Sequence, residues 1–245
     1  MAVDAPVLIG GWWVYLRYNM GSTHLNPNDK QINNAYRIRR ALIAQGYTDL
    51  AIAGVIGCFQ VESGLSPGAL DTHLSQLPNN GEILSALTNT VMLGYCDYAN
   101  PSARGYGTGL AQWDRGVSSA SPQGNVIASY AIRNNMEWYS GDLQMMRLEA
   151  EYQADLLSPG TFWHYNWGSF SWQDFKSLST GTPSNSADIW TSCFEVSSLD
   201  PTGRQNRRDN AEYWYQYFID HPLPITSLLI IMNRRKELLR RGKHP

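Results

Sequence analysis

Apolar and polar positions along the chain recur mainly at helical spacing. In residues 30–45, apolar side chains fall three to four positions apart, and Gly46 is placed to end the helix. A second helix is predicted from Asp49 to about Ser63, with Thr48 as its N-cap and Gly64 as the residue that ends it. This second segment is apolar on almost every side, which indicates a buried helix.

Further helices are predicted along the rest of the chain, and strands are scarce. Ser171 to Asp174 is typical of a capping box at the start of a short helix. Pro183, after Thr182, suits the first position of another helix that runs to Glu195. The remaining predicted helices cover 126–139, 142–157 and 205–219, with a short one near 82–92. The pattern therefore predicts a mostly α-helical protein.

The middle of the chain breaks this pattern. Residues 64–125 are rich in Gly, Asn, Pro and Ser and have weak periodicity, which predicts a long irregular loop region. Such loops in a globular domain are often functional. The ends also differ in composition, so we expect an N-terminal arm over 1–27, a main domain over 28–220 and a basic tail over 221–245.

Composition and charge narrow the class of protein. The chain has 245 residues, 43% of them hydrophobic, which is enough for a substantial core. Its net charge is −2, and residues 234–245 hold six of the 19 basic residues and one of the 21 acidic ones. The body is therefore acidic, and we predict no nucleic-acid partner.

Cysteine and histidine positions do not favour a metal or a disulfide framework. The three cysteines, Cys58, Cys96 and Cys193, lie far apart, and the five histidines form no metal-binding spacing. We therefore predict no metal and no cofactor. No apolar run is long enough to span a membrane, and the N-terminus lacks the features of a signal peptide.

Glu62 stands out as a carboxylate at the end of the apolar second helix. Burial and the negative end of the helix dipole both raise the pKa of a carboxyl group. A protonated glutamate can serve as the general acid that cleaves a glycosidic bond. From its position alone, a surface glutamate near a helix end is the more common explanation.

A glycine-rich stretch at 105–115, GYGTGLAQWDR, adds a second candidate feature. Its glycines allow the backbone to approach a ligand closely. Gln112 can hydrogen-bond to sugar hydroxyl or N-acetyl groups, and the rings of Tyr106 and Trp113 offer flat faces to sugars. A buried tryptophan is, however, more often part of a core.

The two stretches QVESGLSPG and GTGLAQW together resemble the phage tail-associated lysozyme family. The resemblance is greatest to the N-terminal lysozyme domain found in tail-tip (knob) proteins of small short-tailed phages. It extends over about residues 30–218 in the same order. The segments that carry it further are ALIAQGYTDLAIAGVIGCFQVESGLSPG, GTPSNSADIWTSCFE and RRDNAEYWYQYF.

The resemblance implies a lysozyme-like α fold and cleavage of β-1,4 bonds in the glycan strands of peptidoglycan. It implies a virion protein that acts at the host cell wall, with other phage tail proteins as partners. It places the catalytic acid on Glu62. The residues implied to line the substrate cleft are Gly107, Gly109, Leu110, Gln112 and Trp113, which adjoin Tyr106.

Two further residues, Glu195 and Arg207, match positions of the family. They either contact substrate or form a structural pair near the helix ends.

The second carboxylate that glycosidases usually need stays open at this point. Asp71 and Asp97 are favoured over Asp114, all three of them in the irregular region. If no second carboxylate acts, Glu62 would work alone and a group of the substrate would attack, as in a lytic transglycosylase.

Two other functions remain as alternatives. One is a tail-tip structural protein with a lysozyme-like fold and no turnover. The other is a cysteine peptidase built on Cys58 or Cys193, although neither has a recognisable histidine signature.

Overall fold

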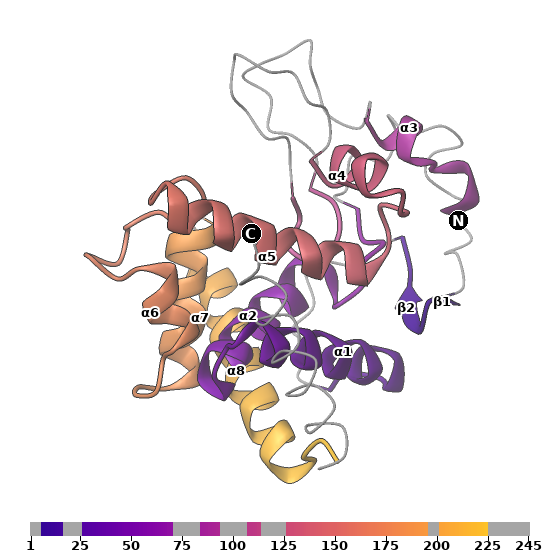
Figure 1. Ribbon diagram of the computed structural model, residues 1–245. Helices are drawn as coiled ribbons and strands as arrows, with labels where there is room; N and C mark the ends of the chain where they lie inside the picture. Colours follow the sequence, from indigo (N-terminus) through magenta and orange to yellow (C-terminus); the bar gives the residue numbers. More distant parts are fainter. Residues whose placement is uncertain are drawn as a thin grey trace. The chain divides into compact units, whose positions relative to one another are not determined.

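The computed structural model describes residues 6–16, 26–70, 84–93, 107–113, 126–195 and 201–224 (Figure 1). Over these residues the chain is mostly α-helical, as the pattern predicted. It divides into two compact units. Unit 1 comprises 1–22, 27–34 and 59–150, and unit 2 comprises 23–26, 35–58 and 151–245. None of the described helices has the length and hydropathy needed to cross a membrane.

The first two helices have the ends that the sequence predicted. Helix α1 spans Asp29–Gln45, and Gly46 follows it at φ +94°, a conformation that glycine adopts readily. Helix α2 spans Asp49–Ser63. The hydroxyl of Thr48 accepts a bond from the backbone N–H of Ala51 at 3.4 Å, which confirms the predicted N-cap.

A short hairpin lies within the segment that was expected to form an extended arm. Strands β1 (Val7–Ile9) and β2 (Trp12–Val14) pair antiparallel in unit 1. Trp12 is buried, and its indole Nε1–H donates to Oδ1 of Asp142 at 3.0 Å. A Cβ at Gly141 would lie 2.3 Å from this ring, so the absence of a side chain there makes room for the indole. Strand β2 is thus part of the core of unit 1, whereas the three residues of β1 are exposed.

Two further helices of unit 1, α3 and α4, are shorter than predicted. The segment near 82–92 forms a 3-10 turn, η3 (Leu84–Ala86), and a short helix, α3 (Asn89–Leu93), which packs on α4. Helix α4 spans Val126–Asn134, so the predicted end at 139 was wrong. Asn135 takes φ +51° and ends the helix, as asparagine often does. Helix α5 (Gly141–Leu157) follows, and its last turns belong to unit 2.

Unit 2 continues with helices α6 (Trp172–Lys176), α7 (Pro183–Trp190) and α8 (Pro201–Asp220). Ser171 and Asp174 form the predicted capping box at the start of α6. After α7 the chain continues as a π-helical turn, η4 (Thr191–Glu195), and α7 and α8 lie side by side (Figure 1). Helix α8 begins earlier than predicted because Pro201 takes its first position.

Aromatic side chains fill the core of unit 2. Trp163 and Trp172 stack with ring centroids 5.5 Å apart, and Trp190 stacks on Phe194 at 4.3 Å. Such pairs stabilise a core beyond the area they bury. The two described cysteines, Cys58 and Cys193, are buried and are not joined in a disulfide.

Candidate functional site

Glu62 is partly exposed, although the part of α2 and the loop around it are almost entirely buried. Every residue from Ala51 to Leu70 is buried except Val61 and Glu62, which are partly exposed. Glu62 lies in the last turn of α2, just before Gly64 and Leu65, which both take positive φ. Glu62 is thus a partly exposed residue that is followed closely by a buried turn. The predicted rise of its pKa stays a prediction.

Side chains from elsewhere in unit 1 hold the loop that follows Glu62. The backbone carbonyl of Gly64 accepts bonds from the hydroxyl of Tyr15 and from Nε2 of Gln31, the latter at 3.3 Å. Nδ2 of Asn34 donates to the carbonyl of Leu65 at 2.8 Å. Satisfied carbonyls of this kind stabilise a turn that two consecutive left-handed residues would otherwise strain.

Ser66 ties the same loop to the hairpin strand. Its hydroxyl donates to the carbonyl of Tyr15 at 2.8 Å and accepts from the N–H of Tyr15 at 3.0 Å. It also accepts from the N–H of Gly68 at 3.2 Å. The backbone after Glu62 is therefore held by Tyr15, which directly follows β2, and by residues of α1, within unit 1.

The glycine-rich stretch joins this loop directly. Thr108 and Trp113 exchange two backbone hydrogen bonds, at 3.1 and 3.0 Å, which closes a tight turn. Thr108 also forms an antiparallel bridge with Leu70, and the N–H of Gly109 donates to the carbonyl of Ala69 at 2.8 Å. The structure thus brings together the two stretches that the sequence singled out.

The predicted binding residues within that turn differ in exposure. Leu110 is fully buried, so its side chain shapes the turn and offers no surface to a ligand. Trp113, Gly107 and Gly109 are buried too, while Gln112 is partly exposed. The side-chain amide of Gln112 donates to the carbonyl of Gly109 at 2.8 Å, which orients its Oε1 atom by fixing the other end of the amide.

Gln144 of α5 is a residue of this site that sequence reasoning missed. Its Nε2 donates to the carbonyls of Pro67 at 2.7 Å and of Trp138 at 2.8 Å, and its Oε1 accepts from the N–H of Leu110 at 2.8 Å. The side chain is wholly buried. It joins the loop after Glu62 to the glycine-rich turn. The sequence feature that could have pointed to Gln144 is a polar residue on the buried face of the helix predicted at 142–157.

Some predicted residues lie outside the part of the chain that the structure describes. They are Asp71, Asp97, Tyr106 and Asp114. Among the described residues, no three His, Cys, Asp or Glu side chains form a group that could hold a metal ion.

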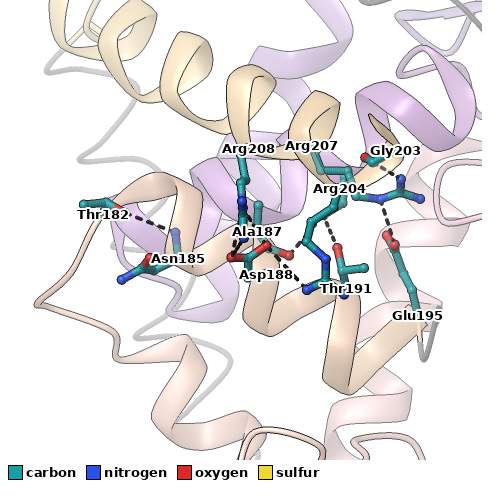
Figure 2. A network of polar contacts seen from close by, with 11 residues as sticks. Thr182, Asn185, Ala187, Asp188, Thr191, Glu195, Gly203, Arg204, Arg207 and Arg208 are labelled. Carbon is teal, nitrogen blue, oxygen red and sulfur yellow. Dashed lines mark hydrogen bonds and ion pairs between the residues drawn. The ribbon is translucent and has the colours of Figure 1, made fainter. Parts of the chain in front are cut away.

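Glu195 lies in a different setting, at the end of η4 in unit 2. Its Oε2 accepts from Nε of Arg207 at 3.1 Å, and the two side chains are 7% and 4% exposed (Figure 2). Burial raises the pKa of the Glu195 carboxyl, and the Arg207 guanidinium partly offsets this, with smaller contributions from Trp190 and Cys58. Glu195 and Arg207 therefore form the structural pair that was one of two expectations.

A second ion pair lies beside the first. Arg208 donates to Asp188 through two nitrogens, Nε and Nη2, at 3.0 and 2.8 Å, and Arg204 approaches the same carboxylate at 3.8 Å (Figure 2). Since Asp188 lies on α7 and the arginines on α8, these contacts join the two helices.

Comparison with known protein families identifies a family for this chain. The model of a family described as phage tail lysozyme matches residues 33–218. No curated protein matches the chain.

Proposed function

The chain belongs to the phage tail lysozyme family, and on this premise we propose that Glu62 is the general acid with which it cleaves glycan bonds. Membership supports a lysozyme-like peptidoglycan hydrolase. We propose more specifically a muramidase-type cleavage of β-1,4 bonds while a phage tail penetrates the cell wall. We also place the catalytic fold in residues 28–220 together with the hairpin at 6–16.

The observation that carries the proposal is the exposure of Glu62. It is the one carboxylate in the stretch from Ala51 to Leu70, and it remains partly open where nearly all its neighbours are buried. A general acid needs both a fixed position and access to its substrate. The hydrogen-bonded loop at 64–70 fixes the position of Glu62, and the partial exposure of Glu62 gives it access to a substrate.

In the proposed mechanism, the protonated carboxyl of Glu62 gives its proton to the glycosidic oxygen as the C–O bond breaks. The positive charge that develops at the anomeric carbon is then met by a nucleophile. We propose Asp71 or Asp97 as the carboxylate that activates water or attacks directly. Gln112 is proposed to hydrogen-bond to the glycan, with Tyr106 and the turn at 107–113 beside it.

Product analysis by mass spectrometry tests this proposal. Purified peptidoglycan is digested with the wild type and with Glu62→Gln, and the soluble fragments are compared. Fragments with reducing ends from the wild type alone are the expected result. Fragments with anhydro-sugar ends would instead identify a lytic transglycosylase, a reaction that needs neither Asp71 nor Asp97. Digestion by Glu62→Gln at the wild-type rate would refute the role of Glu62.

A further inference from the structure

One loop of unit 2 has no role in the mechanism proposed above. The loop between α5 and α6 (Figure 1) carries two aromatic side chains, Tyr165 and Trp167, that are 44% and 43% exposed. All residues from His164 to Ser169 are exposed. Exposing two large rings to water is unfavourable. Two exposed aromatic residues in one hydrogen-bonded loop therefore often mark a binding surface.

Hydrogen bonds to η4 hold this loop in place. The backbone N–H of His164 donates to the carbonyl of Cys193 at 2.7 Å, and Nδ2 of Asn166 donates to the carbonyl of Ser192 at 2.8 Å. The backbone of Trp167 also contacts the thiol of Cys193. The rings are therefore carried on an anchored backbone, which reduces the ordering that a ligand would have to impose.

The chemistry of the loop selects among ligands. Residues 156–173 contain no Asp, Glu, Lys or Arg, in a chain that is 16% charged. Such a surface gives no electrostatic attraction to phosphate backbones or to charged peptides. It instead combines flat aromatic faces with amide and hydroxyl groups, which suits a neutral sugar. The apolar face of a pyranose ring lies on an aromatic ring, and its hydroxyls hydrogen-bond to neighbouring polar groups.

We propose that Tyr165 and Trp167 of unit 2 form an accessory glycan-binding platform, made of residues other than those that hold Glu62 and the glycine-rich turn. The proposed occupant is the glycan strand of peptidoglycan, so the assignment of this ligand rests on the proposed function. The platform binds the polymer without cleaving it and thereby raises the concentration of bonds near the enzyme. Its loss is expected to change binding of the polymer and to leave the chemical step unchanged.

The test measures binding without turnover. Full-length Glu62→Gln is incubated with purified insoluble peptidoglycan and with peptide-free glycan strands, and bound protein is measured by sedimentation. In this background Trp167→Ala is expected to weaken binding to both by about tenfold, and Trp167→Phe to retain most of it. Leu157→Ala is the matched control, because Leu157 is an exposed apolar residue of the same unit.

Wild-type enzyme carrying Trp167→Ala provides the second measurement. Its KM for intact peptidoglycan is expected to rise with kcat unchanged. Equal binding by Trp167→Ala and its parent would overturn the platform, as would an equal loss in Leu157→Ala or no binding by the parent. Binding that depends on Trp167 in a protein whose wild type releases no fragments would support the platform and refute the proposed activity.

Discussion

Two glutamates at the ends of helical segments have opposite surroundings in this protein. Glu62 ends α2 in unit 1 and is partly exposed, and the loop after it is fixed by Tyr15, Gln31 and Asn34. Glu195 ends η4 in unit 2, where it is buried against Arg207. In the first case the structure fixes the loop after the glutamate and leaves the residue partly exposed. In the second it encloses the carboxyl itself.

This difference is the basis on which we propose a catalytic role for Glu62 and a structural role for Glu195. Both glutamates belong to segments that resemble the same family, so the resemblance alone could not separate them. A buried carboxyl paired with a guanidinium is held by that pair and is screened from substrate. An accessible carboxyl on a rigid backbone is ready for proton transfer.

The largest expected effect is on the activity of Glu62→Gln. Removing a general acid typically slows the reaction by about 10²–10⁴-fold, and the initial rate of fragment release measures this. The free energy of unfolding should change little, because the side chain is partly exposed. Glu137→Gln replaces an exposed glutamate of the same unit and should keep wild-type activity.

Glu195→Ala should mainly change stability. Removing one partner of a buried ion pair leaves Arg207 without its carboxylate and destabilises a protein by about 3–5 kcal/mol. Denaturant unfolding gives this value, and activity per folded molecule should stay near that of the wild type. A variant of full stability would mean that the pair does not hold η4 to α8.

Gln144→Leu should affect both properties. The substitution leaves the carbonyls of Pro67 and Trp138 and the N–H of Leu110 without their partner, at about 1–3 kcal/mol for each buried group. Because the same bonds join the loop after Glu62 to the glycine-rich turn, we expect a lower kcat in the molecules that remain folded. Wild-type kcat and stability together would remove Gln144 from the site.

The pH dependence of the unfolding midpoint should reflect the titration of the Glu195 carboxyl. Its pKa in the folded state lies above the ordinary value of 4.5, so the folded protein binds this proton more tightly than the unfolded chain. Its contribution is complete below the ordinary value and is lost as the pH rises through the folded-state pKa. The unfolding midpoint of the wild type should therefore fall across this range more than that of Glu195→Gln.

Local signals in the sequence were enough to predict much of the helical structure. Thr48, Gly46 and the capping box at Ser171 act through bonds to near neighbours, so their effect can be inferred from a few residues. The end of α4 was missed because Asn135 is a weaker helix-ending signal than glycine, and only its positive φ makes the end clear.

Long-range contacts account for most of what could not be predicted. The role of Gln144 depends on segments more than thirty residues away, which periodicity does not reveal. The hairpin was missed because its strands are short and its burial depends on Trp12 meeting α5. Glu62 was found because its polar side chain interrupts an apolar run, whereas the pairing of Glu195 with Arg207 needed the structure.

The most direct test measures fragment release and the unfolding midpoint on the same preparations of Glu62→Gln and Glu195→Ala. We expect one variant to lose activity and the other to lose stability. Glu62→Gln should keep the wild-type midpoint and release almost no fragments, while Glu195→Ala should unfold earlier and keep its rate per folded molecule. Fragment release by folded Glu62→Gln at the wild-type rate would contradict the account.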